Sequence, residues 1–157
     1  TIMMLKKIFI LFFFLFLSSC GYEAIHSKKN VRGLDFSINE LNFIGDKTVN
    51  LKIKERLNNY TINKKDKNFS LTISSSSQKN IIAKNTSGDP SIFKNTIVVD
   101  VKILTKDKFE NNLKIIEGFN YNNNSNKFEL KKYEKEIKNN LAKTVADKLI
   151  FKLSNIQ

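Results

Sequence analysis

The sequence contains a single cysteine, Cys20, and a single histidine, His26. One cysteine cannot form an intramolecular disulfide, so the fold must be held together by packing. No carboxylate or cysteine is grouped around His26, whereas a catalytic histidine needs an orienting partner and a metal needs three or four ligands. A Gly-rich phosphate loop and a nucleophile motif are also absent from the sequence. We therefore expect a protein that is not an enzyme and needs no cofactor or metal.

A long hydrophobic run is missing as well. The unbroken apolar stretch from Ile8 to Leu17 has ten residues, about half of the 20 or so that a membrane-spanning helix requires. Lys6 and Lys7 precede this stretch, and the small residues Ser18 and Ser19 follow it. A basic segment, a short apolar segment and small residues, in that order, are typical of a secretory signal.

The end of this signal, Leu17-Ser18-Ser19-Cys20, resembles the lipobox of bacterial lipoproteins. The resemblance implies cleavage before Cys20 and acyl chains on that residue, which would anchor the chain to a membrane. We therefore divide the chain into a signal peptide (1–19), a lipidated tether (20–33) and one domain (34–157). Gly21 stands where many lipoproteins retained in the inner membrane have Asp, which favours the inner leaflet of the outer membrane. The alternative is an ordinary secretion signal in which Cys20 is incidental.

The charge is strongly one-sided, with 27 Lys and Arg residues against 15 Asp and Glu and a formal net charge of +12. Such a balance indicates an anionic partner such as phosphate, acidic lipid or nucleic acid. An exported, membrane-anchored protein meets phosphorylated lipid and rarely meets nucleic acid, so we expect no nucleic-acid partner. Alternatively, most of the lysines form a solvated coat.

The first half of the domain shows a strand followed by a helix. Leu34, Phe36 and Ile38 alternate with polar residues, and the phase then shifts, which predicts a bulge near Asn39 or Glu40. Gly45 is expected to end the strand and Asp46 to cap a helix from about Lys47 to Tyr60.

The second half shows three strands and a long helix. Alternation begins at Phe69, is clearest from Phe93 to Ile103, and returns after a turn at Lys106 and Asp107. In the last strand, one face is expected to carry Phe109, Leu113, Ile115, Phe119 and Tyr121, with Glu117 and Gly118 breaking the regularity. Asn126 and Glu129 have the spacing of a capping box, and apolar residues then recur every four positions from Tyr133 to Leu153. The predicted fold is an α+β two-layer sandwich of order βαβββα, with a mostly antiparallel four-stranded sheet and two helices on one face.

The run Ser74 to Ser77 has two interpretations. It resembles a flexible linker. However, the apolar residues on both sides of it share one phase, so the strand could continue through it beyond the cover of the helices. In that case the hairpin from about Ser74 to Ile92 would project from the core with polar side chains on both faces, a liability unless a partner encloses it.

These pieces together resemble the lipopolysaccharide-assembly lipoprotein family, LptE. The matching segments are CGY, LDFSINEL, DKTVNLKIKERLNNY, SGDPSIFKNTIVVDVKIL, NYNNNSN and KTVADKLIFKL. The resemblance implies a sandwich that sits inside the LptD outer-membrane barrel, helps the barrel assemble and contacts lipopolysaccharide. Lys94 and Lys84 match the hairpin region that the family uses for that contact, and Lys79 belongs to it by position. Lysine binds phosphate as a point charge, without the two-pronged geometry of arginine.

Two other functions fit the sequence. The chain could be an accessory lipoprotein of another outer-membrane complex, or a periplasmic lipid carrier with a closed apolar cavity. A carrier should show a dry pocket, whereas a barrel plug should show an uncovered hairpin.

Overall fold

The computed structural model describes residues 36–105 and 109–156. Its elements are β1 (Ser37–Gly45), α2 (Lys47–Leu57) with a 3₁₀ turn (Asn58–Tyr60), β2 (Asn68–Lys84), β3 (Pro90–Thr105), β4 (Glu110–Asn122) and α3 (Lys127–Ser154). The expectations for the signal peptide, Cys20, His26, the tether and Leu34 fall outside the described residues. So does the turn expected at Lys106 and Asp107.

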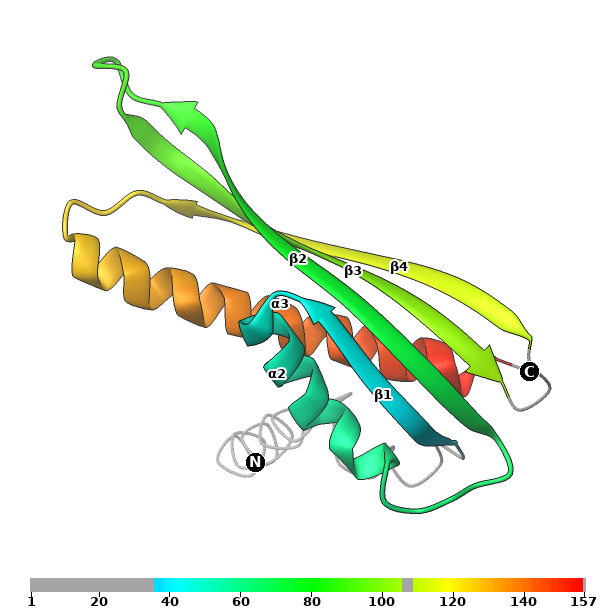
Figure 1. Ribbon diagram of the computed structural model, residues 1–157. Helices are drawn as coiled ribbons and strands as arrows, with labels where there is room; N and C mark the ends of the chain where they lie inside the picture. The colour runs from blue at the N-terminus through cyan, green and yellow to red at the C-terminus, as the bar shows by residue number, and fades with distance from the viewer. Residues whose placement is uncertain (1–35, 106–108, 157) are drawn as a thin grey trace, which may run out of the picture. The chain divides into compact units, whose positions relative to one another are not determined.

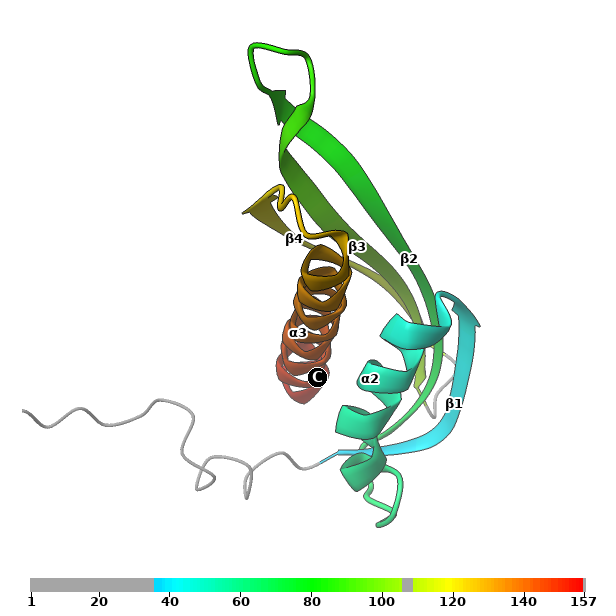
Figure 2. The ribbon, with the colours of Figure 1, turned by 90° about the vertical axis from the view of Figure 1, so that its left-hand side faces the viewer.

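The four strands form one sheet in the order β1-β2-β3-β4. β1 pairs with β2 in parallel, and the other two pairs are antiparallel. Because parallel neighbours need a crossover, α2 lies between β1 and β2 in sequence and packs back onto the sheet. Both helices lie on the same face of the sheet (Figures 1 and 2). The predicted α+β sandwich of order βαβββα is therefore confirmed.

The junction of β1 and α2 follows the sequence closely. The register of β1 against β2 shifts between Ile38 and Glu40, so the predicted bulge is present. Gly45 ends β1 with a φ of +95°, and an added Cβ there would lie 2.0 Å from the Ser75 carbonyl oxygen. Asp46 caps α2, because its Oδ1 accepts hydrogen bonds from the N–H groups of Thr48 at 3.0 Å and Val49 at 3.1 Å.

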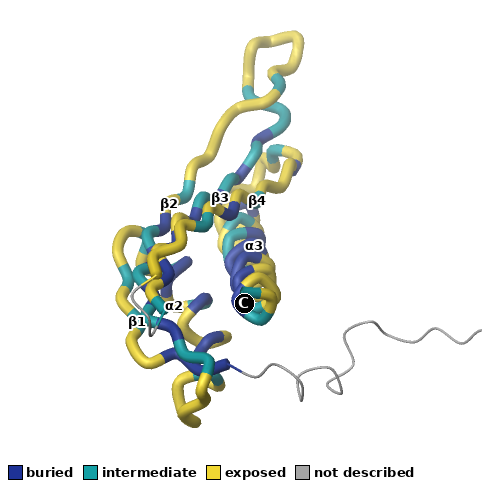
Figure 3. The backbone as a smooth tube through the Cα atoms, turned by 90° about the vertical axis from the view of Figure 1, so that its right-hand side faces the viewer, coloured by how far each residue is buried: buried dark blue, intermediate teal, exposed yellow. Residues whose placement is uncertain are grey.

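The core is formed by buried residues of the two helices and of the strands, coloured dark blue in Figure 3. Phe36 stacks on Tyr60 with ring centroids 4.7 Å apart and also contacts the ring of Phe69 at 5.8 Å. The other fully buried large side chains come from α2, β2, β3 and α3: Ile53, Leu57, Leu71, Ile73, Ile97, Ile103, Leu149 and Leu153. The four-residue apolar repeat of α3 is therefore core, as predicted.

Three details differ from expectation. Phe109 and Phe119 share the parity of buried residues but are 68% and 47% exposed, because Phe109 precedes β4 and β4 is an edge strand. Tyr133, at the start of the α3 repeat, is 44% exposed. Glu117 and Gly118 do not interrupt β4, whose register against β3 is continuous.

The capping box at the start of α3 is completed by a different residue. The Asn126 side chain accepts from the N–H groups of Phe128 and Glu129, as predicted. The Asn126 N–H, however, donates to Asn124 Oδ1 at 2.9 Å rather than to Glu129. A short polar loop thus supplies the acceptor that a Glu at the third helical position provides in the usual box.

Candidate functional surface

The longest strand, β2, is buried on its inward face in its first half and exposed to solvent in its second half. Its inward side chains are buried from Phe69 to Ser75, and the residues from Gln78 to Ile82 are exposed. β1 pairs with β2 only as far as Ser75, whereas β3 pairs with it to Lys84. In Figure 1 the β2–β3 hairpin extends past the end of β1. The serine run is therefore strand, and the linker interpretation was wrong.

The projecting part differs from the predicted hairpin in two ways. It is not polar on both faces, because Ile81 and Ile82 are each 51% exposed. Cover is lost on β2 only: in β3, Phe93 stays buried and its ring lies 5.7 Å from that of Tyr121. The exposed surface is thus the outer half of β2, residues 76–84, with the turn that follows it.

Serines of the run point in alternate directions, and the inward pair joins β2 to α2. Ser75 Oγ donates to Asn50 Oδ1 at 2.7 Å, and the Asn50 side chain donates to the carbonyl of Ile44. Ser77 Oγ donates to Asp46 Oδ2 at 2.7 Å. The serines are small and polar because β2 passes the N-terminus of α2 at this point.

Asp46 also pairs with Lys138 of α3, with Nζ and Oδ2 2.5 Å apart. Burial alone would raise the pKa of the Asp46 carboxyl. The hydrogen bonds from Lys138, Ser77 and the Val49 N–H outweigh burial and lower the pKa from 3.8 to about 2. One carboxylate therefore connects the junction of β1 and α2 to the middle of β2 and the middle of α3.

A second network lies further out along β2. Lys79 Nζ lies 2.5 Å from Glu134 Oε1 and 4.0 Å from the centre of the Phe93 ring. The Tyr121 hydroxyl donates to the same Glu134 oxygen at 2.9 Å. Burial and this bond raise the pKa of Tyr121 well above its ordinary value. Sequence reasoning missed Glu134, which is 55 residues from Lys79 and carries no local signal.

The structure does not bring the three predicted lysines together. Lys79 lies opposite Asn95 on the face that carries the helices. Lys94 lies on the other, open face, with its Cε 2.9 Å from where a Cβ of Gly118 would be. Lys84 is exposed at the end of β2. These lysines therefore cannot bind one phosphate jointly.

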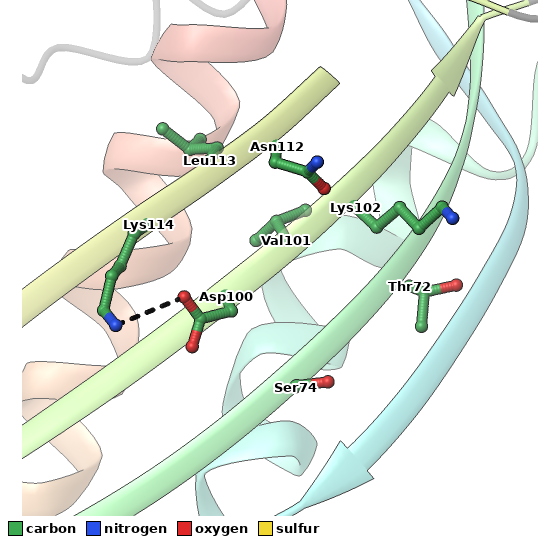
Figure 4. A pocket seen from close by; sticks show the side chains of 8 residues that line it. All are labelled: Thr72, Ser74, Asp100, Val101, Lys102, Asn112, Leu113 and Lys114. Carbon is green, nitrogen blue, oxygen red and sulfur yellow. Dashed lines mark ion pairs between the residues drawn. The ribbon is translucent and has the colours of Figure 1, made fainter. Parts of the chain in front are cut away.

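The open face of the sheet carries a hollow that is open to solvent (Figure 4). Thr72, Ser74, Asp100, Lys102, Asn112 and Lys114 contribute to its lining. Asp100 and Lys114 form an ion pair with an N–O distance of 3.7 Å, and Lys102 pairs with Glu110 at 3.0 Å. Val101 and Leu113 complete the lining, and the hollow is open to solvent, unlike the closed cavity that a lipid carrier needs.

The described part of the chain contains neither a metal-ligand cluster nor a membrane-spanning helix. Within residues 36–105 and 109–156 there is no group of three or more His, Cys, Asp or Glu side chains that could hold a metal ion. In the same residues, the helices are too short or too polar to cross a membrane.

Comparison with known proteins finds similarity in structure only. No protein-family model matches the chain, and no curated protein matches its sequence. Rare lipoprotein B from Shewanella oneidensis aligns with a TM-score of 0.58 at 15% identity, over 74% of this chain and 94% of that one. A minor lipoprotein from Acinetobacter baumannii aligns with a TM-score of 0.55 at 8% identity, over 74% of this chain and 90% of that one.

A third structure, that of an uncharacterized lipoprotein B from Nitrosomonas europaea, aligns with a TM-score of 0.53 at 12% identity. The alignment covers 85% of this chain and 90% of that chain. The TM-scores show that the fold is shared, and at identities this low the alignments show the fold alone.

Proposed function

We propose that the protein is an outer-membrane lipoprotein of the LptE type, anchored by lipid on Cys20 in the periplasmic leaflet. In this role it binds an LptD-type barrel and contacts lipopolysaccharide, and it acts by binding rather than by catalysis. The fold shared with rare lipoprotein B and a minor lipoprotein supports the proposal, as does the lipobox-like LSSC segment.

The observation that carries the proposal is the uncovered outer half of β2. Two adjacent isoleucines, Ile81 and Ile82, are half exposed on a strand that extends past its neighbour. Exposed apolar residues on an uncovered strand are a liability in an isolated protein and mark a surface that a partner covers. A barrel wall around the hairpin would provide that cover.

Lipopolysaccharide contact is assigned to Lys84 and Lys94, with Lys79 in a lesser role. Lys84 is exposed and Lys94 is partly exposed on the open face, so both ammonium groups can meet phosphate on a large ligand. Lys79 is already paired with Glu134, and breaking that pair would offset part of any gain. Because the lysines diverge, they fit an extended polyanion better than a single phosphate.

The barrel contact is tested by recovering the tagged full chain from its own cells with detergent. Ile82→Glu should reduce the recovered barrel at least tenfold, since it places a carboxylate in an apolar contact. Ile62→Glu is the control, because Ile62 is 74% exposed and lies in the loop before β2. If no barrel is recovered with the unmodified chain, or if both variants recover it equally, the proposal is wrong. Recovery of another outer-membrane complex instead would indicate an accessory lipoprotein.

The lipopolysaccharide contact is tested separately with the purified full chain. Changing Lys84 and Lys94 together to Glu should weaken binding at least tenfold, because each charge-assisted bond contributes about 1.5–3 kcal/mol. The control pair, Lys143→Glu with Lys152→Glu, makes the same charge change on exposed positions of α3. Binding should also fall with salt, since exposed charges are screened over about 8 Å at physiological ionic strength. Equal loss in both pairs would assign binding to overall charge and remove these lysines from the site.

A further inference from the structure

β1 is much shorter than the strand that it pairs with. Its register with β2 ends at Gly45 opposite Ser75, whereas β2 continues for nine residues to Lys84. In the described part of the chain, no strand pairs with residues 76–84 on the β1 side, because β1 is the only neighbour of β2 there. The outer half of β2 is therefore a sheet edge that begins in the middle of a strand.

The direction of the backbone groups along this edge follows from one hydrogen bond. The Asp46 N–H donates to the Ser75 carbonyl at 3.0 Å, so that carbonyl points toward β1. Backbone groups alternate in direction along a strand, so those of Ser77, Lys79 and Ile81 point the same way. Those of Ser76, Gln78 and Asn80 point toward β3. Three donors and three acceptors thus line the edge at every second residue.

The edge has little of the protection that natural edge strands carry. Such strands are usually blocked by several charges, a proline or a bulge. Between Ser76 and Lys84 the only charged residues are Lys79 and Lys84, and there is no proline. The register shift comes only after Ile81. The stretch from Ser76 to Ile81 is regular enough to accept another strand.

We propose that this edge binds an extended, acidic peptide segment of a partner protein, which adds to the sheet in line with β1. Side chains of an added strand would point alternately to the open face and to the helix face. On the helix face they would enter a hollow beside Ser77 and Lys79. The hollow is also lined by Thr48, Gln78, Asn95, Glu134, Lys135 and Lys138.

Charge selects the chemistry of this segment. Three of the residues that line the hollow are lysines, but Lys79 is paired with Glu134 and Lys138 with Asp46. The hollow therefore keeps one net positive charge, that of Lys135. The N-terminus of α2 faces the same hollow through Thr48, but the Asp46 carboxylate caps that end of the helix and offsets its dipole. The attraction for an acidic strand therefore comes from Lys135, which a carboxylate on the helix face of the added strand would meet.

A second copy of this chain fits the edge less well. Residues 76–84 contain no acidic side chain, and two copies would each bring the same excess of Lys and Arg over Asp and Glu. Like charges across an interface oppose association. The partner is therefore a different protein. This inference goes beyond the proposed function, since the site takes a peptide rather than a glycolipid and does not depend on a barrel.

The test uses the full chain in detergent and a fluorescent peptide of alternating Glu and Val. This peptide should bind, and the same sequence with Lys in place of Glu should bind at least tenfold more weakly. A Glu-Val peptide that is N-methylated through its centre keeps its charge but cannot donate backbone hydrogen bonds. It should also bind at least tenfold more weakly. If the Glu-Val peptide does not bind, or if the N-methylated peptide binds equally well, strand addition is excluded.

Amide exchange by NMR locates the bound peptide. Saturating peptide should slow exchange of the Ser77, Lys79 and Ile81 amides at least tenfold, with little change at Ser76, Gln78 and Asn80, which already bond to β3. If all six amides are equally protected before peptide is added, the chain covers its own edge and the proposal fails. Equal slowing of both sets would also overturn it.

A pair of matched variants tests the role of charge. Lys135→Glu reverses an exposed lysine that lines the hollow and should weaken Glu-Val peptide binding at least tenfold. Lys143→Glu makes the same change two helical turns away, about 12 Å along α3, and should alter binding less than twofold. Equal effects of the two variants would mean that net charge alone attracts the peptide. The hollow beside Ser77 and Lys79 would then not be the site that receives its carboxylates.

Discussion

Two adjacent residues, Gly45 and Asp46, determine how β1 turns into α2 against β2. The glycine has a positive φ and lies against the Ser75 backbone, whereas the aspartate caps the helix and pairs with Lys138. Their roles differ in kind, since the first is steric and the second is electrostatic. Each can therefore be tested by a substitution that leaves the other role in place.

Gly45→Ala should destabilise the fold by more than about 2 kcal/mol. The backbone conformation alone costs a non-glycine residue about 1–3 kcal/mol, and the added methyl group would overlap the Ser75 carbonyl. Gly88→Ala is the control, because Gly88 has a similar φ of +85° and nothing within 4 Å of an added Cβ. Urea unfolding of both variants measures the difference. If they lose the same free energy of unfolding, the close approach at Ser75 does not limit residue 45.

Asp46 should make the stability depend on acid pH. Its pKa is about 2 in the fold, below the ordinary value of 3.8, so the ionised form stabilises the fold above pH 3.8. That contribution is lost as the pH falls toward 2. We expect a loss of about 1–2 kcal/mol, since one pKa unit is about 1.4 kcal/mol and the site is partly open to solvent.

Asp46→Asn provides the comparison, because asparagine caps helices as well as aspartate but carries no charge. Between pH 4.5 and pH 2, the free energy of unfolding should fall further for the unmodified chain than for this variant. Urea unfolding at several pH values measures both. Parallel pH profiles would show that Lys138 gains nothing from the Asp46 charge.

Among the elements, α3 is the one whose sequence pattern predicted its role most fully. Its apolar residues at every fourth position are buried from Ile137 to Leu153, and Asn126 caps its first turn. A helix that covers a sheet must bury one stripe, and that requirement is visible in the sequence alone. Tyr133 is 44% exposed and falls outside this buried stripe, although its ring packs edge-on against Tyr121 with centroids 6.1 Å apart.

Leu141→Ala should lower the free energy of unfolding by about 2–5 kcal/mol, the range for deleting a large buried aliphatic side chain. Leu141 lies in the middle of the buried stripe and is 9% exposed. Lys143→Ala, on the exposed side of the same helix, should change stability by less than about 0.5 kcal/mol. Thermal unfolding measures both variants. A Leu141→Ala midpoint as high as that of Lys143→Ala would place the stripe outside the core.

At the scale of the whole molecule, the sequence predicted the order of the elements better than it predicted the surface. Alternation and helical periodicity depend on neighbours in sequence, so the sandwich, the bulge after Ile38 and the cap at Asp46 could be inferred. The partners of Lys79 and Lys138 could not be inferred. Glu134 and Asp46 lie 55 and 92 residues from them, and such contacts exist only after the sheet and helices pack together. The opposite faces of Lys79 and Lys94 also follow from strand register, which sequence alone left open.

The parallel pairing of β1 with β2 also affects the order in which the chain can fold. β2, β3 and β4 join through short turns, so they can pair as soon as they meet, whereas β1 must wait for a strand that lies beyond α2. Contacts between residues close in sequence form faster than contacts that close long loops. We therefore expect the antiparallel strands β2, β3 and β4 to assemble first and β1 to dock onto them afterwards. The first strand to leave the ribosome would then be the last to join the sheet.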